Sequence, residues 1–259
     1  MPGAVETLPI LTYHSISNEP GPTSIAPEIF RAQMEEIAAA GVDVVSLDEV
    51  ACWVAGQASF ERRTVAITFD DAFSDFAGAA FPVLERLKFP ATVFVPTAIV
   101  GGAENWIGAN DNARKLMDWE EIGALARRGV AFGSHTKSHA DLTGLDGAEL
   151  DEELSASRKE LEARLARPAP HFAPPYGRSN EAVRSAIMRH YSLSVGVRLD
   201  EARRSSPIGD LPRIEMFYYR DLGQWRAFLD GRGGAYLQIR RAARGVRETL
   251  SGMTRQRHY

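Results

Sequence analysis

The chain has 259 residues, of which 44% are hydrophobic and 25% are charged, and its formal net charge is -4. This length suits one α/β barrel or two small domains, and the composition is that of an ordinary globular protein. The negative charge argues against general nucleic-acid binding. The single cysteine, Cys52, cannot form an internal disulfide, so nothing in the chain requires an oxidising compartment.

Residues 1–7 lack the positive and apolar regions of a signal sequence, and no later run reaches the roughly 18 apolar residues of a membrane span. We therefore expect a soluble, cytoplasmic protein with no transmembrane segment, and an exported one if a leader has been trimmed. Residues 232–259 carry seven arginines and one acid, Glu248. This basic tail indicates a solvated helix face or a contact in a homo-oligomer, with an anionic lipid or polymer surface as the alternative.

Apolar runs and segments of helical period alternate along the chain. Strands are expected at residues 8–13, 42–45, 64–69, 91–95, 130–134, 171–173, 192–197 and 211–217. Helices are expected at residues 27–40, 46–56, 73–87, 118–129, 146–166, 179–189, 221–229 and 235–250. No change of composition marks a linker, so the pattern predicts a single barrel-like α/β domain over residues 1–259, with residues 221–259 as a helical, basic extension.

Local signals refine some of these boundaries. Ser46 with Glu49, and Asp118 with Glu121, predict helix N-caps, and Ser179 is the expected cap of the helix that follows it. Pro82 should kink its helix or reset where it starts. Residues 101–117 form a polar, glycine-rich connection that is long for a compact domain, and such loops are more often functional than idle.

Two adjacent carboxylates, Asp70 and Asp71, follow the β-branched run at residues 64–67. Neighbouring side chains of an extended chain point in different directions, so one carboxylate can hold a cation while the other handles a proton. The alternative is that the strand ends in a polar turn, with Asp71 capping a helix that begins near Phe73.

Two histidines, His135 and His139, follow another expected strand at a spacing of four residues. That spacing would place both imidazoles on one face of a helical turn, close enough to share a metal ion. Taken alone, such a pair more often caps a helix or lies on the surface. With Asp71 it supplies two nitrogens and one carboxylate oxygen, and Asp70 is then free to accept a proton from water, which describes a metal-assisted hydrolase.

Three runs resemble, in order and separation, the polysaccharide deacetylases of carbohydrate esterase family four: Thr68-Phe69-Asp70-Asp71, His135-Thr136-Lys137-Ser138-His139 and Pro175-Tyr176-Gly177. The resemblance covers roughly residues 8–217. It implies a distorted (β/α) barrel with fewer than eight regular repeats and metal-dependent removal of acetyl groups from an N-acetylated sugar.

The resemblance also implies roles for single residues. Asp71, His135 and His139 would hold one divalent ion, for which zinc suits the ligand set and cobalt, nickel and manganese are compatible. Asp70 would be the general base. The backbone N–H of Tyr176, in the Pro175-Tyr176 turn, would help to stabilise the oxyanion.

The chain departs from the family pattern at two places. Ala173 stands where the family usually has the arginine that orients the base, and the late Leu-x-x-His motif that supplies the general acid is missing. His14, at the end of the first expected strand, is our candidate acid, as in the branch that includes exopolysaccharide deacetylases. Arg213, on the last expected strand, is our candidate partner of Asp70.

Trp106, in the long loop, could stack on a sugar ring or serve as a packing anchor. The substrate that the family resemblance implies is an acetylated sugar. Two alternatives stay open: a catalytically impaired carbohydrate-binding protein on the same fold, indicated if His14 lies far from the two histidines, and a deacetylase or amidohydrolase of a small metabolite.

Overall fold

The structure is a computed structural model that describes residues 5–106 and 113–255. Its centre is a ring of seven parallel strands, closed because β2 pairs with both β4 and β10. In ring order they are β2 (Ile10–Tyr13), β4 (Thr64–Phe69), β5 (Thr92–Val95), β6 (Ala131–Ser134), β7 (His171–Phe172), β8 (Leu193–Leu199) and β10 (Leu211–Glu215). The predicted barrel with fewer than eight strands is confirmed.

An additional strand, β3 (Asp43–Val45), pairs in parallel with the first residues of β4. Every residue of β2, β4 and β5 is buried, which explains why these strands appear in the sequence as continuous apolar runs without alternation. At the top of the barrel, Tyr13 and Phe69 stack with their ring centroids 5.3 Å apart, and Phe76 packs edge-on against Phe69. These rings fix the strand ends from which His14 and Asp70 follow.

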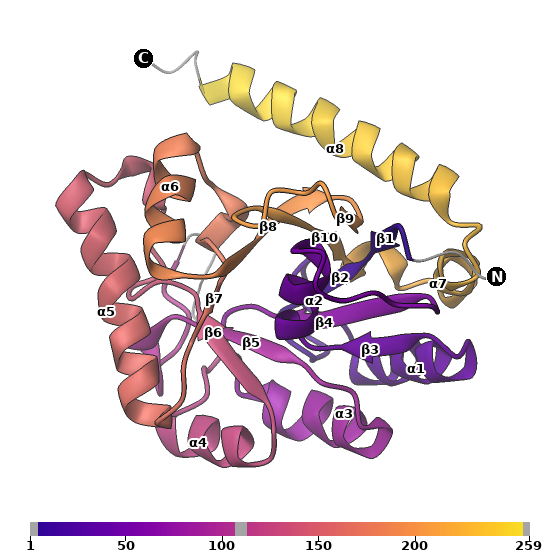
Figure 1. The fold of residues 1–259 in the computed structure, drawn as a ribbon, viewed down its shortest axis with the longest axis horizontal. Coiled ribbons are helices and arrows are strands. Elements are labelled where there is room, and N and C mark those ends of the chain that lie inside the picture. Colours follow the sequence, from indigo (N-terminus) through magenta and orange to yellow (C-terminus); the bar gives the residue numbers. More distant parts are fainter. Residues whose placement is uncertain (1–4, 107–112, 256–259) are drawn as a thin grey trace.

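The helices of the described chain lie mostly around the ring of strands (Figure 1). They are α1 (Pro27–Ala39), α2 (Leu47–Val54), α3 (Phe81–Leu87), α4 (Trp119–Arg127), α5 (Gly147–Leu165), α6 (Glu181–His190), α7 (Leu222–Leu229) and α8 (Gly234–Arg255). The capping boxes of α2 and α4 form as expected from the sequence. The expected cap of α6 was wrong by one residue, because Asn180, and not Ser179, accepts the hydrogen bond of the Val183 N–H, at 2.9 Å.

The segment expected as one helix at residues 73–87 is divided. A π-helical turn, Phe76–Ala80, leads into α3, whose first turn contains Pro82. Proline is tolerated in a first turn because its missing N–H would be unpaired there, so Pro82 resets the start of the helix. The expected strand at residues 8–13 is also divided at Pro9, which separates β1 (Thr7–Leu8) from β2.

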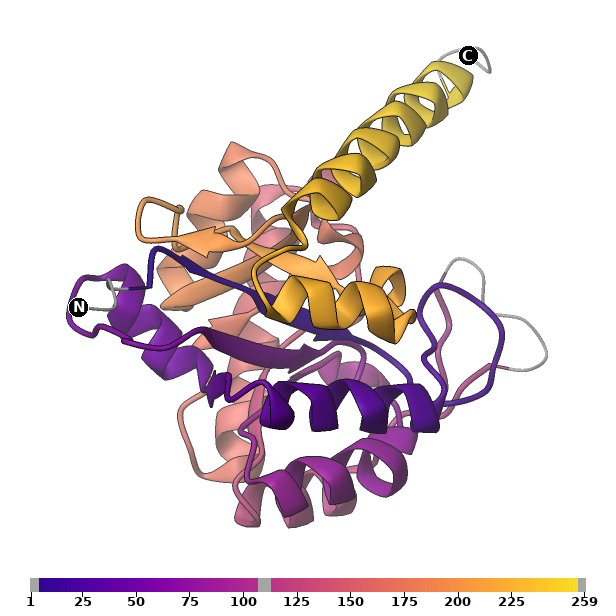
Figure 2. The same cartoon turned by 90° about the vertical axis from the view of Figure 1, so that its right-hand side faces the viewer.

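The two C-terminal helices differ in how they relate to the barrel. Helix α7 packs against α1, where Trp225 and Phe228 are buried and the Trp225 indole donates to the Gln33 carbonyl at 3.0 Å. Helix α8 begins beside the barrel and then projects away from it (Figure 2). No helix of the described chain is both long and apolar enough to cross a membrane.

Candidate active site

The chemically active side chains predicted from the sequence converge at the carboxyl ends of the strands. They line a cleft of about 580 Å³ to which β2, β4 and β6 contribute the residues that follow them, namely His14, Asp70, Asp71, His135 and His139. This is the end of a parallel barrel at which the strand-to-helix loops can build a site.

Asp71, His135 and His139 form the only group of three or more potential ligands found among the described residues. Their ligand atoms lie within 4.8 Å of one another, and Oδ1 of Asp71 lies 3.3 Å from Nε2 of His135 and 3.2 Å from Nε2 of His139. All three side chains are buried. Two imidazole nitrogens and one carboxylate oxygen are a donor set that fits zinc and related divalent ions.

The helix-cap alternative for Asp71 is wrong. Asp71 and Ala72 have positive φ angles of 72° and 56°, and the π-helical turn starts only at Phe76, without a side-chain cap. The unusual backbone turns the Asp71 carboxylate toward the histidines. Such strain in non-glycine residues is typical of functional sites.

The loop that carries the histidines is not the helical turn expected from their spacing. Thr136 and His139 have φ angles of 68° and 62°, and the described loop contains no helix. It is held from outside: the backbone N–H groups of Lys137 and Ser138 both donate to Oε2 of Glu153, on α5, at 2.9 Å. Long-range hydrogen bonds therefore replace helical geometry in bringing the two imidazoles together.

His135 is oriented by a buried hydrogen bond of 2.7 Å between its Nδ1 and the carbonyl oxygen of Ala173. A carbonyl only accepts, so Nδ1 carries a proton and Nε2 faces Asp71. Although burial opposes this, the hydrogen bond with Asp71 and the charge of Asp70 raise the pKa of His135. Burial alone would raise the pKa of Asp71, but its hydrogen bonds with His135 and His139 hold that pKa well below the ordinary value. Burial lowers the pKa of His139, which favours the neutral form that binds metal.

Asp70 makes a bidentate ion pair with Arg213, with both N–O distances 2.7 Å. Arg213 is itself 1% exposed, and its Nε donates to the carbonyl of Gly196 at 2.8 Å. Burial would raise the pKa of Asp70, and the Arg213 charge and hydrogen bonds overcome this, so the pKa lies below its ordinary value. The site thus contains a fixed, ionised carboxylate beside the three-ligand cluster.

His14 reaches the same cleft, with Nε2 3.9 Å from Oδ2 of Asp70. The Asp70 N–H donates to the Tyr13 carbonyl at 2.9 Å, which ties the two strand ends together. Asp75 anchors the turn after His14 by accepting hydrogen bonds from the Ser15 hydroxyl at 2.6 Å and from the Ile16 N–H at 2.8 Å. The buried Nδ1 of His14 has no hydrogen-bond partner among the described residues.

Pro175 and Tyr176 form a tight turn against the cluster. Pro175 is buried, and Tyr176 adopts a φ of 58°, with its hydroxyl 3.3 Å from Nδ1 of His139. The next residue, Gly177, also has a positive φ, and a Cβ there would lie 2.0 Å from Val197 on β8. Glycine is required at this position because the turn approaches β8 so closely.

Trp106 lies over His139, with ring centroids 4.0 Å apart and an interplanar angle of 27°. It also lines the cleft. The indole therefore packs against a ligand of the cluster and faces the space that a substrate would enter.

Sequence reasoning missed an ion pair on the cleft wall. Arg114 makes two hydrogen bonds of 2.8 Å to Glu104, a third to the Ser24 hydroxyl at 3.1 Å, and lies 4.1 Å above the ring of Phe73. Both charged residues fall in the long connection at residues 101–117, where no periodicity relates them. Only the general expectation that this loop is functional pointed to them.

The chain is similar to known polysaccharide deacetylases. The model of the family described as polysaccharide deacetylase matches residues 57–192, more than half of the chain. The chain is 26% identical over 210 residues to a Bacillus subtilis protein named as a polysaccharide deacetylase, YxkH, with 81% of this chain and 71% of that protein covered. It is 25% identical over 213 residues to the Staphylococcus aureus poly-β-1,6-N-acetyl-D-glucosamine N-deacetylase, with 78% and 71% covered.

A solved structure shows the same fold. The Streptococcus pyogenes deacetylase PplD, in complex with acetate, superposes with a TM-score of 0.71 at 24% identity, covering 83% of this chain and 92% of that one. At this identity the likeness establishes the architecture of the barrel alone.

Proposed function

Because the chain belongs to the polysaccharide deacetylase family, we propose that it removes acetyl groups from an N-acetylated sugar with the help of one divalent ion. The substrate would be a polysaccharide, oligosaccharide or glycoconjugate of the N-acetylglucosamine type. One observation carries the proposal: a buried cluster of three potential metal ligands lies in the same cleft as the Asp70 carboxylate, which is paired with Arg213.

Asp71, His135 and His139 are proposed to hold the ion, zinc by preference, with cobalt, nickel or manganese also compatible. When bound, the ion supplies Lewis-acid polarisation of the acetamide carbonyl and makes water a stronger nucleophile at neutral pH. The exclusion of bulk water from the buried ligands strengthens these electrostatic effects.

Asp70 is proposed as the general base that takes a proton from the attacking water. Its ion pair with Arg213 occupies both carboxylate oxygens and fixes their plane, so Arg213 acts as a positioning residue that keeps the base ionised and aimed.

His14 is proposed as the general acid. In its protonated form it would donate a proton to the amine nitrogen as the C–N bond breaks, because an amide ion is too poor a leaving group to depart without one. The distance of 3.9 Å between Nε2 of His14 and Oδ2 of Asp70 supports this role, since both groups can face one reacting carbon.

The remaining roles concern the substrate. The backbone N–H of Tyr176, held in its turn by Pro175, is proposed to donate to the oxyanion of the tetrahedral intermediate. Trp106 is proposed to stack on a sugar face at the rim of the cleft.

The position of His14 favours a hydrolase over a carbohydrate-binding protein that has lost catalysis. That alternative predicted a His14 remote from the two histidines, whereas it lines the same cleft. A small-metabolite amidohydrolase is distinguished by assay, because it would prefer simple acetamides to sugar oligomers.

The test is acetate release from N-acetylglucosamine oligomers, with acetamide and acetylated amino acids as comparison substrates. We expect release from the oligomers, its loss with chelator, and a loss of roughly 10³-fold or more in Asp70→Asn. Asp43→Asn, at a half-buried surface position, is the control and should keep full activity. Oligomer activity that survives both chelation and Asp70→Asn would overturn the proposal.

A further inference from the structure

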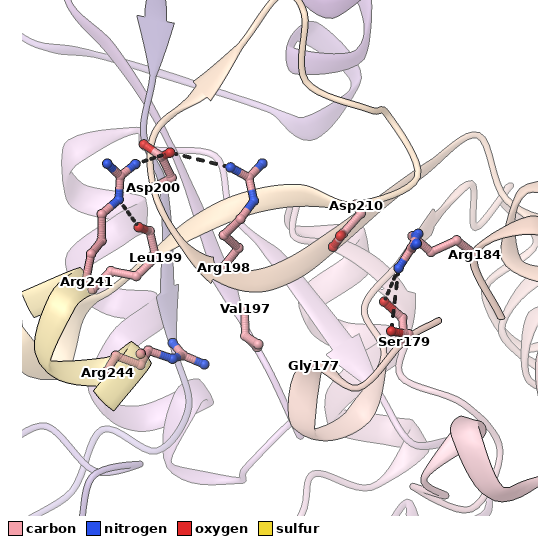
Figure 3. Close-up of a pocket in the computed structure, with 11 residues that line it drawn as sticks. Gly177, Ser179, Arg184, Val197, Arg198, Leu199, Asp200, Asp210, Arg241 and Arg244 are labelled. Carbon is pink, nitrogen blue, oxygen red and sulfur yellow. Dashed lines mark hydrogen bonds and ion pairs between the residues drawn. The ribbon is translucent and has the colours of Figure 1, made fainter. Parts of the chain in front are cut away.

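Figure 3 shows the lining residues of a second cleft, of about 590 Å³. Gly177 and Val197 line both clefts, so the two spaces lie on either side of the turn that carries Tyr176. The second cleft is therefore adjacent to the place where the acetamide of a substrate would lie beside the cluster.

Arginines dominate this second cleft, with four of them against two aspartates among its lining residues. Asp200 is shared by two of the four, Arg198 at 3.4 Å and Arg241 (Figure 3). One carboxylate thus balances only one of two guanidinium charges, and the group keeps a net positive charge.

Arg184 lies on the opposite wall of the cleft from Asp200 (Figure 3). Its guanidinium makes long hydrogen bonds to Ser179, 3.5 Å to the carbonyl and 3.4 Å to the hydroxyl. Neither acceptor carries a charge, and among the described residues no carboxylate lies within ion-pair distance of the Arg184 guanidinium. A guanidinium without a carboxylate partner can donate two parallel N–H hydrogen bonds to a phosphate or carboxylate.

The start of α8 completes the cleft with Arg241 and Arg244. Arg241 is fixed to β8 by a hydrogen bond of 2.7 Å from its Nε to the carbonyl of Leu199. These residues lie outside residues 57–192, the part matched by the family model. Part of the basic tail noted in the sequence therefore forms a wall of a cavity beside the site.

We propose that the second cleft binds an oxyanion of the substrate, a phosphate or a carboxylate, next to the sugar whose acetyl group is removed. This inference rests on the proposed deacetylase function and specifies its substrate class: an anionic acetylated glycan or glycoconjugate. Arg114, the arginine that lines the catalytic cleft, is already paired with Glu104, which leaves the arginines of the second cleft for the anion.

The kinetic test compares three trisaccharides of N-acetylglucosamine: a neutral one, one with a reducing-end phosphate and one that ends in a uronate. We expect kcat/KM to be roughly tenfold higher for an anionic substrate, the effect of one charge-assisted contact, and the gain to fall with added salt. The two anionic arms show whether phosphate or carboxylate is preferred.

Variants locate the effect. Arg184→Gln/Arg198→Gln should abolish the gain while leaving kcat/KM for the neutral trisaccharide unchanged. The matched control is Arg189→Gln/Arg203→Gln, which removes the same charge at exposed positions of α6 and β9 (Ala202–Arg203) outside the cleft. It should keep the gain.

Binding to the Asp70→Asn protein, measured by calorimetry with metal present, separates this inference from the proposed function. If no trisaccharide is deacetylated by the wild type, the proposed function fails, and the affinities still test the cleft. Equal affinity for neutral and anionic trisaccharides, or a preference that persists in Arg184→Gln/Arg198→Gln, would overturn the inference.

Discussion

The buried ion pair of Asp70 and Arg213 fixes the position and the charge of the proposed base. Asp70 follows a strand whose sequence is plainly apolar, so its place at the barrel mouth could be predicted from the chain alone. That Arg213 pairs with it depends on β10 closing the ring against β2 and β8, a long-range feature. The sequence could offer Arg213 only as a candidate from its place on the last strand.

Removing Arg213 should leave a buried carboxylate without its partner. For Arg213→Met we expect a loss of about 3–5 kcal/mol of unfolding free energy and a fall in kcat of roughly 10²-fold or more. Urea unfolding and acetate release measure the two effects. Asp70→Asn/Arg213→Met should recover much of the stability and none of the activity.

The control for this pair is Arg62→Gln, which breaks an exposed ion pair with Asp43 and should cost less than about 1 kcal/mol. An Arg213→Met protein with wild-type kcat would show that the ion pair does not position the base.

The loop between β6 and η3 (Leu142–Gly144) shows the limit of sequence patterns at the scale of an element. The four-residue spacing correctly suggested that His135 and His139 approach each other, but the helical turn inferred from it was wrong. Thr136 and His139 take positive φ angles, which a β-branched residue such as threonine rarely adopts. The conformation is imposed from α5 by Glu153 and from the 3-10 turn after β5, η2 (Thr97–Ile99), by hydrogen bonds such as Thr97 N–H to the Thr136 carbonyl.

Glu153 should therefore act on the ligands through the loop. In Glu153→Ala, three hydrogen bonds to Lys137 and Ser138 are lost, and we expect metal affinity to fall roughly 10- to 100-fold. Competition with a chelator of known affinity measures this. Its neighbour Glu152 provides the control, since its carboxylate pairs with the exposed ammonium of Lys137 and not with the loop backbone, and Glu152→Ala should bind metal normally.

If Glu152→Ala and Glu153→Ala lost metal equally, the effect would be one of surface charge and not of loop geometry.

At the scale of the whole molecule, the alternation of strands and helices was sufficient to predict a parallel barrel, because parallel strands require helical crossovers. The small antiparallel pair β1 and β9 escaped prediction, since two residues each are too few to show a period. The position of α8 was equally inaccessible. Its basic sequence indicated a surface helix, but only the fold brings Arg241 beside β8.

The pH dependence of stability provides a test at this scale. Burial raises the pKa of Asp75, against the hydrogen bonds from Ser15 and Ile16. A raised pKa in the folded state means that ionised Asp75 costs stability as pH rises from the unfolded value toward the folded one. Asp75→Asn removes this cost. The unfolding free energy of the variant minus that of the wild type should therefore be larger at about pH 7 than at about pH 4, which is close to the ordinary aspartate pKa.

Glu162→Gln is the matched control of opposite sign. Although burial opposes it, hydrogen bonds from Arg158 and the Ala169 N–H lower the pKa of Glu162, so its contribution to stability is present above the unfolded pKa and lost as pH falls. Urea unfolding of metal-free protein at both pH values should give opposite trends for the two variants. The same trend for both variants would show that the folded protein does not raise the pKa of Asp75.

The central claim is that Asp71, His135 and His139 hold the ion on which deacetylation depends. Its most direct measurement is a titration of metal-stripped protein with zinc that follows bound metal and acetate release together. We predict that activity rises in proportion to bound zinc and stops at one equivalent, and that His135→Ala and His139→Ala lose both. Full activity in the stripped protein, or a full equivalent of tightly bound zinc in both histidine variants, would contradict it.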